Sequence, residues 1–118
     1  MNVPIEIWLR GDNHATTETL AASVGEPGSW TDADVASVLI GMLRAIDRAK
    51  NPDTPADRPV SFRGFSWIVN PFEGGVLIAM EMTLGAVVAG PFTIPEGQLT
   101  AMIHRVVSAD RAQTATVH

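Results

Sequence analysis

The stretch that decides the fold is GGVLIAMEMTLGAVVAGPFTIP, residues 74–95, in which Glu81 is the one charged side chain. The segment is long enough to cross a bilayer, but it contains several glycines and prolines, and a carboxylate inside hydrocarbon is costly. Its side chains alternate in the period of a strand. We therefore predict two antiparallel strands, at about 76–83 and 86–92, with the tight turn at Leu84 and Gly85, and no membrane span.

A helix is predicted upstream, over about 32–50. Thr31 and Asp34 have the spacing of a capping box, and Trp30 and Val35 stand at the two positions of a hydrophobic staple. Apolar residues then recur at helical spacing, which lays one stripe along the helix. The stripe consists of Val35, Val38, Leu39, Met42, Leu43 and Ile46.

The remaining segments complete the predicted order. NPDTPADRP, residues 51–59, is a solvated loop, and VSFRGFSWIV, residues 60–69, is a strand with a bend at Gly64. Alternation at residues 5–9 predicts a first strand, and helical spacing predicts a second helix over about 95–108. Residues 11–29 are left open between a short helix and an irregular strand.

These elements predict one α+β domain over residues 1–118, with a polar C-terminal tail at 109–118. The expected architecture has two layers, with two helices and an antiparallel sheet of three to four strands in β-α-β-β-β-α order. The strands of the meander are apolar on both faces. We expect the two helices to lie together on one face, which leaves the other face, or a strand edge, exposed for self-association, with a symmetric dimer as the commonest outcome. The alternative is a monomer in which the first strand and residues 11–29 cover that face.

The predicted faces group the strand residues as follows. One face carries Val76, Ile78, Met80, Met82, Val88 and Phe92, and the other carries Phe65, Trp67, Val69, Leu77, Ala79, Val87 and Ala89.

Composition narrows the classes of function. The net charge is −5, and clustered Lys and Arg are lacking, which argues against direct nucleic-acid binding. No cysteine is present, so thiol catalysis and cysteine-ligated metals are excluded. The N-terminal residues lack the basic, apolar pattern of a secretory signal, so a cytoplasmic location is expected. No cofactor and no metal site are predicted.

Two groups of polar residues are weighed for chemistry. Asp12, Asn13 and His14 follow a strand end and would suit a general base or a metal ligand, but Gly-Asp-Asn is equally an ordinary turn sequence. Glu81 would need a partner if its face is buried, and Arg63 is the candidate across the strands. On an oligomer rim, Glu81 would instead be solvated.

Three functions remain open, and no catalytic residue set is predicted. The leading one is a non-enzymatic interaction or assembly module that acts through an apolar sheet face or edge as a homo-oligomer. A second is a small-molecule binder or cofactor-free enzyme. A third is an acidic inhibitor that occupies a basic site on a partner. The candidate residues for an interface or pocket are Trp67, Leu77, Glu81, Arg63 and Phe65, and those for the acidic inhibitor are Asp32, Asp34, Asp53 and Asp57.

Overall fold

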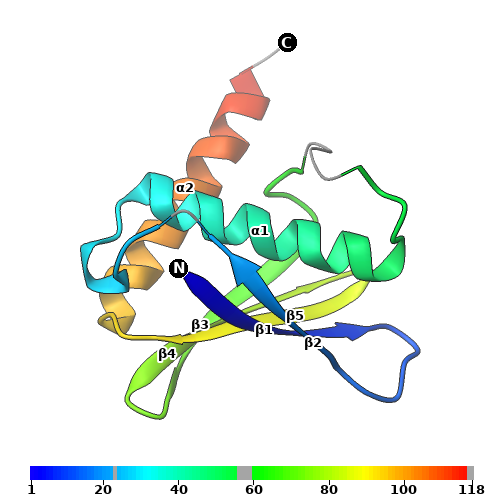
Figure 1. Ribbon diagram of the computed structural model, residues 1–118. Coiled ribbons are helices and arrows are strands. Elements are labelled where there is room, and N and C mark those ends of the chain that lie inside the picture. Colours follow the sequence, from blue (N-terminus) through cyan, green and yellow to red (C-terminus); the bar gives the residue numbers. More distant parts are fainter. Residues whose placement is uncertain (23, 56–59, 117–118) are drawn as a thin grey trace.

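The computed structural model describes residues 1–22, 24–55 and 60–116, with side chains up to Asp110. It has one five-stranded antiparallel sheet and two long helices, which confirms the predicted α+β class (Figure 1). The elements are β1 (Asn2–Leu9), β2 (Thr16–Ala21), η1 (Pro27–Ser29), α1 (Asp32–Lys50), β3 (Phe65–Phe72), β4 (Gly75–Met82), β5 (Gly85–Phe92) and α2 (Glu96–Thr116). The sheet has five strands rather than three to four because the segment left open includes β2.

The strands lie in the order β2-β1-β5-β4-β3, and every neighbouring pair is antiparallel. The β3-β4-β5 meander and the β1–β2 hairpin join where β1 pairs with β5. Residues 2–21 therefore widen the sheet instead of crossing its second face. The two edges of the sheet are β2 and β3.

The predicted capping box is present at the start of α1. The Asp34 amide donates to Thr31 Oγ1 at 3.3 Å, and the Thr31 amide donates to Asp34 Oδ2 at 2.9 Å. These bonds satisfy donors that the first helical turn leaves without partners. Where α1 passes β2, a Cβ at Gly41 would lie 2.8 Å from Cδ2 of Leu20, so glycine permits this close approach.

Both helices lie on the same side of the sheet, and they contact each other there (Figure 1). The apolar stripe of α1 is buried against this side, together with Leu99, Met102 and Ile103 of α2. The rings of Trp30 and Phe92 meet edge to face, with centroids 4.9 Å apart. Among the described residues, every buried side chain of the core is apolar. The arrangement confirms the expectation that the two helices lie together.

Two predicted boundaries are wrong. The second helix does not end near residue 108: α2 continues to Thr116, since no glycine or proline interrupts residues 98–116. The strand predicted from Val60 begins at Phe65, directly after Gly64, whose φ is +75°. Within the described ranges, neither helix has the length and apolar character that spanning a membrane requires.

The predicted grouping of the strand faces is also wrong. Each turn of the meander has two residues, so an even-numbered residue pairs with an odd-numbered one, except beyond the register shift between Val76 and Ile78, where Val76 pairs with Phe92. Met80 lies opposite both Trp67 and Val87, and directly paired side chains share a face. Val87 and Ala89, together with Phe65, Trp67 and Val69, therefore belong to the side covered by the helices, and Val88 belongs to the other side.

Candidate functional site

The second side of the sheet is the strongest candidate for a functional surface. We call it the open face, because no described segment crosses it (Figure 1). Strand alternation and register define its residues. They are Pro4, Glu6 and Trp8 of β1, Thr17 and Thr19 of β2, Ser66, Ile68, Asn70 and Phe72 of β3, Leu77, Ala79 and Glu81 of β4, and Ala86 and Val88 of β5.

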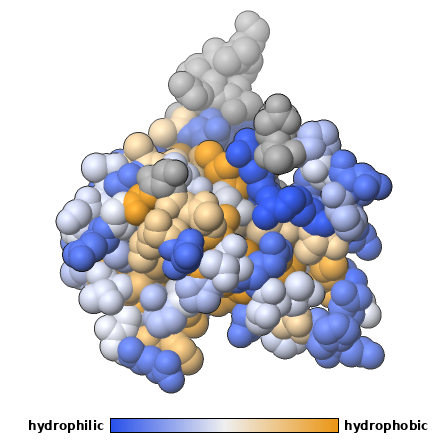
Figure 2. Space-filling model, in the orientation of Figure 1, coloured by the Kyte–Doolittle hydropathy of each residue, from blue (hydrophilic) through white to orange (hydrophobic). Residues whose placement is uncertain are grey.

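Large apolar side chains of the open face are exposed. The relative exposure is 45% for Trp8, 54% for Ile68 and 46% for Phe72, and these are three of the four large hydrophobic residues exposed in the described chain. Hydrophilic residues occupy the two hairpin tips, that of β1–β2 at the lower right of Figure 2 and that of β3–β4 at the lower left. The exposed side chains of Trp8, Ile68 and Phe72 belong to the strands β1 and β3. An antiparallel sheet with one wet face normally shows polar side chains there.

A shallow groove of about 630 Å³ runs across this face. Its floor and walls come from β1, β2, β4 and β5, and Phe72 stands at the β3 side. Glu6, Thr17 and Thr19 supply polar groups to an otherwise apolar lining, to which Leu77 and Val88 contribute. The groove is open to solvent and combines apolar walls with the carboxylate of Glu6, while Glu18, which also borders it, pairs with the buried Ile5 on the helix side.

Glu81 lies in a second, smaller hollow of about 170 Å³ on the same sheet. Ser66 and Ala86 are its direct cross-strand neighbours. Glu81 is exposed, and within the described residues no ion pair joins it to Arg63. The predicted Arg63–Glu81 pair is therefore not formed.

The structure separates the remaining predicted pocket residues. Trp67 borders the hollow that contains Glu81, but by register its side chain stands on the helix side, where it packs against the core. Phe65 is buried on that same side. Leu77 and Glu81 do share the open face. The predicted set thus mixes two sides of one sheet.

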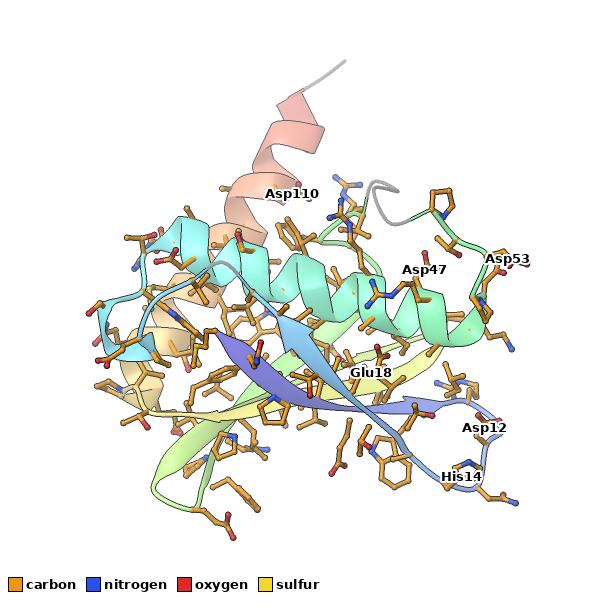
Figure 3. The ribbon with its side chains drawn as sticks, in the orientation of Figure 1. Asp12, His14, Glu18, Asp47, Asp53 and Asp110 are labelled. Carbon is orange, nitrogen blue, oxygen red and sulfur yellow. The ribbon has the colours of Figure 1, made fainter. Side chains whose placement is uncertain are left out.

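The polar cluster is at the tip of the β1–β2 hairpin. Asp12 and His14 project from this tip, away from α1 and the rest of the sheet (Figure 3). Asp12, Asn13 and His14 are all exposed, and the Asp12 amide donates to the Leu9 carbonyl at 3.1 Å. That hydrogen bond closes the turn and fits the turn interpretation of this sequence. Among the described residues, no group of three His, Asp or Glu is arranged to hold a metal ion.

The acidic candidates that the structure describes do not form one surface. Arg105 of α2 donates two hydrogen bonds of 2.9 Å to the carboxylate of Asp32, and these bonds lower the pKa of Asp32 below its ordinary value of 3.8 and raise the pKa of Arg105. Asp34 serves the capping box. Asp53 lies exposed in the loop after α1 (Figure 3), and Asp57 lies outside the described residues.

Sequence reasoning missed the most exposed members of the open face. Trp8, Ile68 and Phe72 were not among the predicted site residues. Even-numbered residues of one strand share a face with odd-numbered residues of the next across a two-residue turn, and this rule would have placed Ile68 with Leu77 and Glu81 on one face. The alternation of Trp8 with the buried Ile7 would have placed Trp8 opposite the core in the same way.

Comparison of the chain with models of protein families, with curated proteins and with solved structures found no match.

Proposed function

We propose that this protein is a non-enzymatic protein-interaction module that uses its open face to self-associate. The observation that carries the proposal is the grouping of Trp8, Ile68 and Phe72, each about half exposed, on one face of the sheet. Contiguous apolar surface on a folded protein commonly marks an interface. Large aromatic side chains are also the residues that contribute most to binding at interfaces.

The size of the face suits a weak dimer. Five strands of six to eight residues present on the order of 500–600 Å² of projected area, given strand spacings of about 4.8 Å and a rise of about 3.3 Å per residue. Two copies would bury roughly 1,000–1,200 Å², near the lower limit for specific association. We therefore expect a dimer whose population depends on protein concentration.

Charge also limits the affinity. The open face carries Glu6 and Glu81 and no basic residue, so both acids would lose hydration in a contact between identical faces. Arg10 lies at the end of β1, but its guanidinium Nε already donates to the Thr83 carbonyl at 3.0 Å. Apolar contact would have to outweigh the cost of two carboxylates from each copy, which again favours reversible association.

Sedimentation velocity over a dilution series tests the proposal. The weight-average sedimentation coefficient of the wild-type protein should rise with protein concentration, and Ile68→Lys should remain monomeric because it places a charge among the exposed apolar side chains of the open face. Ala33→Lys is the matched control, since Ala33 is exposed on α1. A wild-type protein that stays monomeric up to about 1 mM would contradict self-association.

The groove supports a second candidate, a small-molecule binder. Its volume of about 630 Å³ falls within the ordinary range for ligand sites, and Glu6 with Thr17 and Thr19 would orient a polar group. Because the carboxylate favours a cation, the ligand class would be an amphipathic amine. Ligand-observed NMR with a set of aliphatic and aromatic amines tests this candidate, and binding should be lost in Glu6→Gln. Equal binding by wild type and Glu6→Gln would exclude the groove as an amine site.

A further inference from the structure

The open face contains both a projecting side chain and a recess that could receive it from another copy. Trp8 projects from β1 with 45% of its surface exposed. The groove begins four residues away on the same strand, at Pro4, and extends toward Leu77 and Gly90. A surface that carries a knob and a matching recess is self-complementary, which is what a two-fold dimer requires.

The register of the sheet specifies where the two-fold axis would lie. Glu6 is midway between Trp8 and Pro4 on β1, and Glu6 pairs with Val88, Val88 with Ala79, and Ala79 with Ile68. An axis that lies in the interface and runs along this row exchanges the positions of Trp8 and Pro4. The two positions are about 13 Å apart along the strand.

We propose that two copies pack their open faces together about this axis, with Trp8 of each copy seated in the groove of the other. This inference rests on the proposed function, since it specifies the geometry of the same contact. The axis brings Ile68 of each copy against its equivalent, which adds apolar contact at the β3 edge. Stacked sheets of this kind lie about 10 Å apart, a separation that side chains from both faces fill.

The same axis also brings Glu6 close to Glu6 of the second copy. The repulsion between two like charges opposes the contact. Removing the charge should therefore strengthen self-association. A basic peptide or another cationic partner on this face would show the opposite response, because it would lose its counter-charge.

Complementation between two variants tests the geometry. Trp8→Ala removes the knob and leaves the groove, whereas Thr19→Trp fills the groove and leaves the knob. Each variant alone should dissociate at least about tenfold more readily than wild type, as expected for loss of a central tryptophan contact. A mixture of the two retains one intact knob and groove per pair, so it should associate more tightly than either variant alone.

The readouts are dissociation constants from sedimentation equilibrium, together with urea midpoints that verify folding. Leu77→Trp is a second groove-filling variant if Thr19→Trp unfolds. Glu6→Gln should tighten the dimer several-fold. A wild-type dimer that is unaffected by the Trp8 and groove variants, or a mixture no tighter than its components, would overturn this geometry and leave the proposed function standing. A strictly monomeric wild type would overturn both.

Discussion

A matched pair of isoleucines tests the assignment of the two sheet faces. Ile78 on β4 is fully buried beneath the helices, and Ile68 on the neighbouring β3 is 54% exposed on the open face. Threonine at either position keeps the β-branched shape that strands favour. Ile68→Thr and Ile78→Thr therefore differ mainly in the burial of the changed atoms.

The expected magnitudes follow from that burial. Ile78→Thr removes two buried carbons, which costs about 1.6 kcal/mol, and buries a hydroxyl among apolar side chains without a hydrogen-bond partner, which costs a further ~1–3 kcal/mol. We expect the free energy of unfolding to fall by about 3–4 kcal/mol. Ile68→Thr leaves its hydroxyl in water and should change the free energy of unfolding of the monomer by no more than about 0.5 kcal/mol.

Urea unfolding followed by far-ultraviolet circular dichroism measures both values. It should be done at a protein concentration low enough for the monomer to dominate, and the slopes of the transitions should agree between the variants. Equal losses of stability in the two variants under these conditions would refute the face assignment, because Ile68 would then be covered within one chain.

Three further outcomes test local structure. Thr31→Ala should lower the free energy of unfolding by about 1 kcal/mol through loss of the capping hydrogen bond, whereas Thr31→Ser should keep most of the wild-type stability. Equal urea midpoints for Thr31→Ala and wild type would contradict the capping role. Gly85→Ala should prevent stable folding, as judged by circular dichroism, because the added Cβ would collide with the Trp8 carbonyl. Gly97→Ala is the control: a Cβ at Gly97 in α2 meets open space, so this variant should be neutral or stabilising. The Arg105 hydrogen bonds lower the pKa of Asp32, so their stabilising effect is present above pH 3.8 and is lost as pH falls below that value. The difference in urea midpoint between wild type and Asp32→Asn should therefore shrink between about pH 5 and 2. A difference that is independent of pH would contradict this role.

Helix α1 was predictable because several local signals agree. The capping pair, the flanking Trp30, the apolar stripe and the stop at Asn51 and Pro52 all specify the same 19 residues. The meander was predictable from the alternation of its strands, although its second turn consists of Thr83 and Leu84 rather than the predicted Leu84 and Gly85. In each case the structure follows from short-range chemistry that the sequence displays directly.

Strand β2 was not predictable in the same way. TTETLA has two apolar residues facing opposite sides, and its position is stabilised by partners far along the chain. Leu20 packs at Gly41 of α1, and Glu18 lies 3.8 Å from Arg48. Edge strands held by such contacts have weak local patterns, since tertiary packing determines them.

The candidate surface was predicted in kind but not in composition. An uncovered apolar face follows from the alternation of the meander, and the structure shows that both helices leave one face uncovered. To assign residues to this face, one must know which side chains of each strand point to the same side as those of the next strand. Across a two-residue turn, odd-numbered residues of one strand share a side with even-numbered residues of the next. The prediction did not apply this rule, and it therefore placed Trp67 and Phe65 on the wrong side.

The central claim is that the open face is a contact surface, and hydroxyl-radical footprinting at two protein concentrations tests it most directly. Trp8, Ile68 and Phe72 should react readily in dilute protein and become protected in concentrated protein. Met1 is 46% exposed and lies outside the open face, so its reactivity should stay constant and serve as the internal control. Unchanged reactivity of all four residues between the two concentrations would contradict the claim.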